Sequence, residues 1–259
     1  MNIRKCEWVF LCLWMLKDLA WVQDWFWIGM TTGIITLIWS MNLLTLSLYY
    51  RNYNESWHCV AQFLWVFGNF WWMWAELHDI NYPYEYPIYD KNTQESGYML
   101  IAALAWLCMY YIGMRVILPR PSQEGIDMYE MVHAKRFYLN GKQYENLHII
   151  LWLLKDTAWN KQLIIMWWIS VIPTVLIALD FIILATEDRM FYVVQFIWVV
   201  SNLTWAFGEL YIPQHNESIA LFTFETDSFL TMRWYSAWTL VAAILLVVLH
   251  LVYLICLKQ

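Results

Sequence analysis

The sequence predicts an all-α integral membrane protein with six transmembrane helices, arranged as two three-helix repeats. The composition is the first reason, because hydrophobic residues make up 61% of the 259 residues and charged residues only 14%, whereas soluble domains are about half apolar and a quarter charged. The second is a series of long apolar runs, and the third is a Trp-rich segment that occurs twice. Because lipid cannot satisfy open backbone groups, we expect the runs to form helices.

Six apolar runs are predicted to cross the membrane, because about 20 apolar residues in a helix span a hydrocarbon core of about 30 Å. Four of the runs contain few polar residues, and two are slightly interrupted. The four long runs are 25–50, 97–118, 163–186 and 229–256, and the two interrupted runs are 58–77 and 190–210. They predict that the protein is located within a membrane.

A shorter apolar segment precedes the first and the fourth of these runs. The segments 8–21 and 147–159 each contain an adjacent lysine and aspartate between Trp residues. Both are short for a span, and Trp and Lys are favoured at the headgroup level. We therefore interpret each segment as a short interfacial helix that inserts at most part way. In an alternative interpretation both segments span, which makes eight transmembrane helices in two groups of four.

An internal repeat is the strongest pattern in the sequence. Residues 13–21 read LWMLKDLAW, and residues 151–159 read LWLLKDTAW. A second shared pattern comprises Gln62, Trp65, Asn69, Trp72 and Glu76 in one copy and Gln195, Trp198, Asn202, Trp205 and Glu209 in the other. We therefore divide the chain into a first membrane repeat, a polar linker and a second membrane repeat, at 1–118, 119–146 and 147–259. A short surface helix is predicted within the linker, over 127–139.

The repeated polar residues fall on one stripe of each helix, because they recur at three- and four-residue intervals. A polar stripe is costly against lipid and should face the helix bundle. There it acts either as hydrogen-bonding glue between helices or as the lining of a pathway for a substrate or an ion. The amides on the two stripes are Gln62, Asn69, Gln195 and Asn202, and the carboxylates are Glu76 and Glu209.

Charged residues inside the apolar segments are the remaining site candidates. The repeated motif contributes four candidates for ion pairs, which are Lys17, Asp18, Lys155 and Asp156. They serve either as headgroup anchors or as a buried ion pair between the two halves. Asp180 is the only charged residue in the run 163–186, where a carboxylate costs about 2.5–3.5 kcal/mol on insertion scales. We therefore rank Asp180 before Glu76 and Glu209 among residues that would bind a proton or a cation.

The sequence predicts no metal centre, catalytic site or cofactor site. Glu76, His78 and Asp79 are near one another and have suitable donor atoms, but a paired-histidine motif is missing, so they are weak metal candidates. The sequence contains no recognisable nucleophile–base motif, which disfavours an enzyme, and it identifies no cofactor. A net charge of −6 without a basic cluster excludes nucleic acid as a partner.

Two functions are compatible with these patterns. The duplication and the intramembrane polar residues favour a small transporter or an ion- or proton-translocating protein. The alternative is a non-catalytic structural or accessory subunit of a membrane complex, in which the aromatic surface contacts other subunits or a second copy of the chain. In both cases the lipid bilayer is a partner. The segment 81–90, with four Tyr and two Pro, is suited to cover a site or to dock on a partner.

Overall fold

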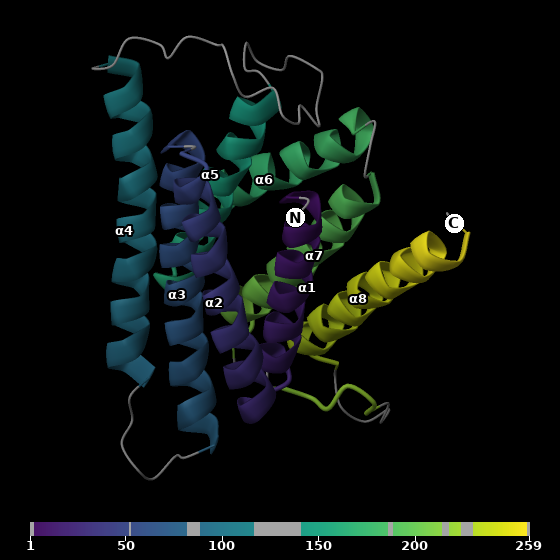
Figure 1. Ribbon diagram of the computed structural model, residues 1–259. Helices are drawn as coiled ribbons and strands as arrows, with labels where there is room; N and C mark the ends of the chain where they lie inside the picture. Colours follow the sequence, from purple (N-terminus) through teal and green to yellow (C-terminus); the bar gives the residue numbers. More distant parts are fainter. Residues whose placement is uncertain are drawn as a thin grey trace. The chain divides into compact units, whose positions relative to one another are not determined.

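In the computed structural model, all regular elements of the described residues are helices (Figure 1). The structure describes residues 3–51, 53–81, 89–116, 141–185, 189–213, 218–223 and 230–257. The helices are α1 (Ile3–Val22), α2 (Phe26–Tyr49), α3 (Tyr53–Asn81), α4 (Tyr89–Val116), α5 (Gly141–Asn160), α6 (Ile164–Leu184), α7 (Arg189–Tyr211) and α8 (Met232–Leu257). The helix predicted over 127–139 lies outside the described residues, as do residues 82–88 of the segment with four Tyr and two Pro.

Five of the described helices are long and apolar enough to cross a membrane. They are α2, most of α4 (Lys91–Gly113), α6, α7 and most of α8 (Met232–Tyr253). These helices confirm the prediction of an all-α protein of the membrane type. Helix α3, which contains the run 58–77, has 29 residues and is long enough, but Gln62, Asn69 and Glu76 lower its mean hydropathy.

Helices α1 and α5 are longer than the apolar pattern suggested, since each has 20 residues. At about 1.5 Å per residue such a helix is about 30 Å long, which is also the thickness of a hydrocarbon core. Helix α5 begins at Gly141, within the segment expected to be linker. Its first turns contain Lys142, Gln143 and Glu145, which favour helix although they are polar, and an apolar pattern therefore does not reveal them.

The turn after α1 and the turn after α5 have the same backbone conformation. Asp24 has a φ of 56° and Gln162 a φ of 53°, so both residues adopt the left-handed conformation that ends many helices. The amide of Trp25 donates to the carbonyl of Ala20, and the amide of Leu163 donates to that of Ala158, both at 2.8 Å. Each turn therefore ends one helix and starts the next within a few residues.

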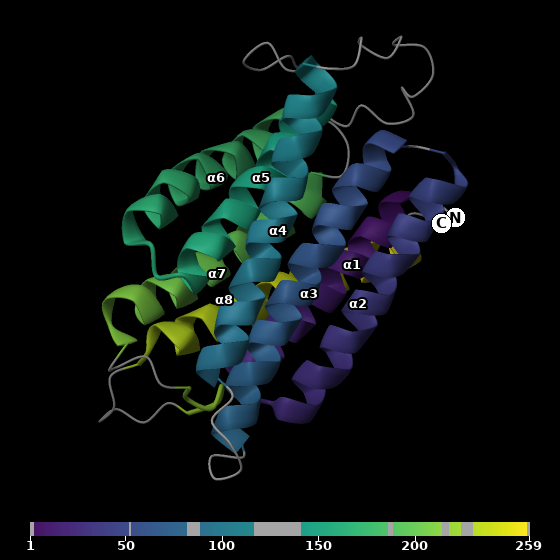
Figure 2. The same cartoon turned by 90° about the vertical axis from the view of Figure 1, so that its left-hand side faces the viewer.

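The chain folds into two compact units, and each unit combines segments from both of the repeats predicted from the sequence. Unit 1 consists of Met1–Ile38, Phe70–Thr93 and Met190–Gln259, and unit 2 consists of Trp39–Asn69 and Gln94–Arg189. Helix α1 packs on α8 in unit 1, and α5 packs on α6 in unit 2 (Figure 2). The division of the sequence at 118 and 147 concerns the copies of the repeat and stays a prediction.

Helices α2 and α3 approach each other closely in unit 1. A Cβ atom added at Gly33 would lie 2.5 Å from Cδ2 of Phe70 and 3.0 Å from Cε of Met73. We therefore expect Gly33→Ala to lower the free energy of unfolding by about 1–3 kcal/mol, because the neighbours must shift. Thermal unfolding in detergent measures this loss. Gly113→Ala is the matched control, since nothing lies within 4 Å of its added Cβ, and equal effects of both substitutions would contradict the prediction.

Candidate functional site

The lysine and aspartate of the first motif form a buried ion pair in unit 1. Lys17 Nζ lies 2.5 Å from Asp18 Oδ1, and the two residues are only 0% and 3% exposed. The ion pair thus joins two adjacent residues of one helix inside unit 1, and it does not link the two halves of the sequence. The local cause is helical periodicity, which places Trp14, Lys17 and Trp21 on one face of α1.

Asp18 receives two further hydrogen bonds from α7. The indole Nε1 of Trp198 donates to Asp18 Oδ2 at 2.8 Å, and Nδ2 of Asn202 donates to the same oxygen at 3.3 Å. The ammonium of Lys17 lies 5.7 Å and 5.0 Å from the ring centroids of Trp14 and Trp21, within the range of cation–π attraction. We call Lys17, Asp18, Trp198 and Asn202 the Lys17 centre.

Unit 2 contains a matching set of contacts. Lys155 pairs with Asp156, and Asp156 Oδ2 accepts a hydrogen bond from Trp65 Nε1 at 2.8 Å. Trp65 also contacts Trp152 with an interplanar angle of 61°, as Trp198 contacts Trp14 with an angle of 60°. We call Lys155, Asp156 and Trp65 the Lys155 centre. In each centre the motif aspartate of one predicted repeat accepts a hydrogen bond from a Trp of the other predicted repeat.

A second group of buried charges lies in unit 1 at the end of α1. Arg233, at the start of α8, pairs with Glu76 Oε1 at 3.0 Å and with Asp24 Oδ1 at 3.2 Å through its Nη2 atom. Nη2 also donates to the backbone carbonyl of Trp21, and Trp21 Nε1 donates to Glu76 Oε2 at 3.1 Å. We call Trp21, Asp24, Glu76 and Arg233 the Arg233 cluster. Glu76 is thus paired with Arg233.

Tryptophan rings enclose the Arg233 cluster. The ring of Trp21 lies 4.8 Å from that of Trp205 and 5.3 Å from that of Trp72, edge to face in both cases. The guanidinium carbon of Arg233 lies 5.3 Å from the Trp205 centroid, and Trp205 Nε1 donates to Glu209. Glu209 therefore lies next to the Arg233 cluster, because Trp205 contacts both Glu209 and Arg233. Trp21 and Trp205 are 2% and 1% exposed, and electrostatic interactions are stronger in such buried surroundings than in water.

Asp24 and Arg233 were not among the site residues predicted from the sequence. Arg233 is the only lysine or arginine within the run 229–256, and this isolated cation is the signal that would have identified it. Asp24 lies in the short turn between α1 and α2, where an aspartate is common for backbone reasons alone. Burial raises the pKa of Asp24 above its ordinary value, although the charge of Arg233 and a hydrogen bond from Ser218 lower it.

The remaining sequence candidates differ in burial and in their contacts. Asp180 is half-buried on α6 in unit 2, and Gln62 and Gln195 are half-buried. Asn69 is buried and donates to the carbonyl of Trp65 at 3.1 Å. His78 Nδ1 lies 3.5 Å from Asp79 Oδ1. Among the described residues, no group of three His, Cys, Asp or Glu side chains is placed to hold a metal ion.

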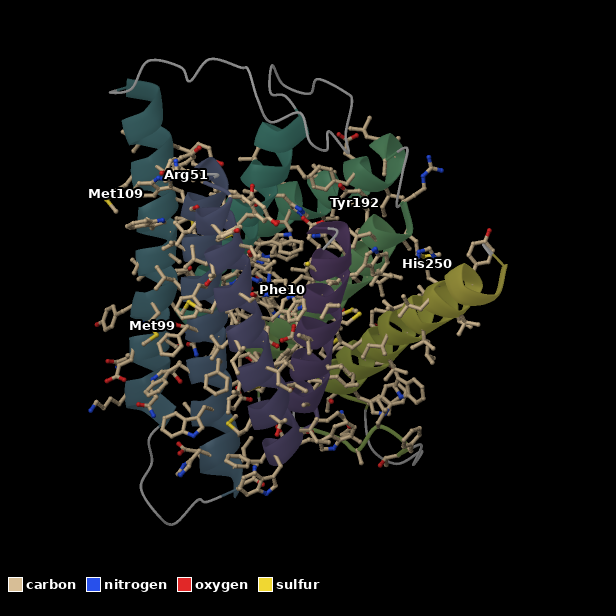
Figure 3. The ribbon with its side chains drawn as sticks, in the orientation of Figure 1. Phe10, Arg51, Met99, Met109, Tyr192 and His250 are labelled. Carbon is tan, nitrogen blue, oxygen red and sulfur yellow. The ribbon has the colours of Figure 1, made fainter. Side chains whose placement is uncertain are left out.

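One histidine contributes to aromatic packing near the other end of α1. His250, which is labelled on α8 in Figure 3, stacks on Trp8 with ring centroids 5.4 Å apart. Phe191 of α7 meets Trp8 edge to face at 5.1 Å. These contacts hold α1, α7 and α8 together within unit 1.

Comparisons with protein-family models, with curated proteins and with solved structures found no match to this chain.

Proposed function

We propose that the protein translocates a proton or another small cation across a membrane. The observation that carries this proposal is the occurrence of buried ion pairs on helices of a membrane-type chain, at Lys17–Asp18 and Lys155–Asp156. Buried ionisable side chains are costly in membrane proteins, and they commonly mark ion or proton pathways. A protein that needed only apolar packing would not require them.

The proposal includes six spans in two three-helix repeats. The five apolar helices supply five spans, and the sixth is α3, which at about 1.5 Å per residue is about 43 Å long. The matching turns at Asp24 and Gln162 and the matching contacts of the Lys17 and Lys155 centres support two copies of one ancestral unit. With three spans per copy, the copies are inverted, an arrangement that transporters use for alternating access.

The first test of translocation is the flux of protons through the purified protein in lipid vesicles. We expect Asp180→Asn to lower the pH-dependent flux by about tenfold, the effect of about 1.4 kcal/mol on a barrier, because the substitution removes a titratable group from α6 at nearly constant volume. Asp79→Asn is the matched control, since Asp79 is also half-buried. Unchanged flux in Asp180→Asn would exclude this residue from the pathway, and a wild type without flux would contradict translocation.

A second candidate function is that of an accessory subunit in a membrane complex. It is favoured by three exposed tyrosines around the end of α2, namely Tyr49, Tyr50 and Tyr53, which are 78%, 69% and 65% exposed. Tyrosine is enriched where proteins bind one another. Purification in mild detergent separates the two functions, because stoichiometric co-purifying subunits would support the second and a protein that purifies alone with flux would support the first.

A further inference from the structure

Two carboxylates and a backbone carbonyl converge on one nitrogen of Arg233. Nη2 lies 3.0 Å from Glu76 Oε1, 3.2 Å from Asp24 Oδ1 and 3.2 Å from the carbonyl oxygen of Trp21. A guanidinium NH₂ group has two hydrogens, so it cannot direct one hydrogen to each of three oxygens. The two carboxylates therefore compete for the same donor and lie close to each other.

The charges around this nitrogen do not balance. Asp24 and Glu76 both contact Arg233, and Glu209 of α7 adds a third carboxylate that acts on Arg233 through its charge. Lys17, the lysine of the motif on α1, is paired with Asp18. Within the part of the chain that the structure describes, the remaining polar contacts of the two carboxylates come from the Trp21 indole and the Ser218 hydroxyl, which are uncharged. Full ionisation would leave an excess of negative charge in this region.

The surroundings make that excess costly. Arg233 is 7% exposed, and the side chains of Glu76 and Asp24 are 13% and 20% exposed. The neighbouring rings of Trp21, Trp72 and Trp205 are themselves buried, at 2%, 3% and 1% exposed. Two carboxylates that share one site in such a medium cannot both ionise easily, so one of them holds a proton. The pKa of Asp24, which burial raises, agrees with this charge count.

We propose that Asp24 and Glu76 form a proton-binding site, in which the two carboxylates share one proton beside Arg233. The bound proton is the hydrogen of a carboxyl O–H group. On release it passes to water, the carboxyl becomes a carboxylate, and Arg233 then faces two negative charges. Asp24 is the exchange point, because its side chain is the more exposed of the two. This inference rests on the proposed translocation and names its proton site.

Infrared difference spectroscopy on the purified full-length protein tests the site, with the pH stepped between about 5 and 9, above the ordinary pKa of a carboxyl near 4. The wild type should show a protonated-carboxyl band that disappears as the pH rises. Asp24→Asn and Glu76→Gln should each abolish the band, because the remaining carboxylate of the pair keeps its contact with Arg233 and has no second carboxylate of the pair with which to share a proton. Asp79→Asn, on the same helix as Glu76, should leave the band unchanged.

Isotope labelling can also identify which carboxyl groups give rise to the band, without any substitution. Carbon-13 aspartate and carbon-13 glutamate, incorporated in separate preparations, should each shift part of the band if both carboxyls share the proton. This measurement covers the case in which a variant fails to fold. A wild type without the band, a band that survives in either Asp24→Asn or Glu76→Gln, or a shift with only one label would overturn the shared site.

Flux through vesicles separates this inference from the proposed function. If the infrared band behaves as expected but the protein shows no proton flux, the proposed translocation is contradicted and the proton-binding site is supported. Flux in a protein without the band would overturn the site alone. If both hold, the pH dependence of flux in Asp24→Asn should differ from that of the wild type, because the titrating pair has been reduced to one carboxylate.

Discussion

Replacement of Lys17 by Met is expected to lower the free energy of unfolding by about 3–5 kcal/mol, the cost of leaving a buried charge without its partner. Lys17 is fully buried and lies 2.5 Å from Asp18 Oδ1. Without the ammonium, Asp18 keeps the hydrogen bonds from Trp198 and Asn202 but loses its counter-charge. Chemical unfolding in mixed micelles, followed by circular dichroism, measures the change.

Two further variants distinguish loss of the ion pair from loss of packing. Lys17→Met combined with Asp18→Asn should recover much of the stability, because no uncompensated charge remains and the amide oxygen still accepts from Trp198. Lys91→Met is the matched control, since Lys91 is exposed on α4, and it should change stability little. A double variant as unstable as Lys17→Met alone would show that the ammonium contributes through packing and not through its charge.

The membrane helices could be predicted from sequence because their signal is local. A run such as 163–186 needs only length and apolarity to be identified, and α6 occupies most of it. The bounds of helices α1 and α5 were harder to predict, because polar residues such as Lys142 and Glu145 extend a helix without adding to an apolar run. For the same reason the sequence pattern underestimated the lengths of both helices.

The motif residues could be predicted as important, but their partners could not. The repeated Trp-Xaa-Xaa-Lys-Asp-Xaa-Xaa-Trp segment identified Lys17 and Asp18, and helical spacing placed their Trp neighbours on the same face. The bond from Trp198 to Asp18 joins residues far apart in the chain, and the pairing of Glu76 with Arg233 does the same. Such pairings depend on tertiary packing, which a single sequence does not report.

Replacement of Arg233 by Met is expected to destabilise the protein by at least about 3–5 kcal/mol at neutral pH. Arg233 supplies the counter-charge for Asp24 and Glu76 and donates to the carbonyl of Trp21. Its loss leaves two carboxylates among the rings of Trp21 and Trp205. Arg233→Lys should be intermediate, because a single ammonium retains the charge but not the planar group that lies over the Trp205 ring.

The pH dependence of Arg233→Met gives the sharper test. Burial already raises the pKa of Asp24, and Arg233 opposes that rise, so removing the guanidinium raises this pKa further. The folded variant then binds more protons than the unfolded chain, and its stability must fall as the pH rises from the ordinary carboxyl pKa near 4 through the raised value. Acidification, or the added substitution Asp24→Asn, should therefore restore part of the lost stability. Unfolding curves recorded from about pH 5 to 8 measure this slope, and a stability loss that does not vary with pH would mean that Arg233 acts by packing alone.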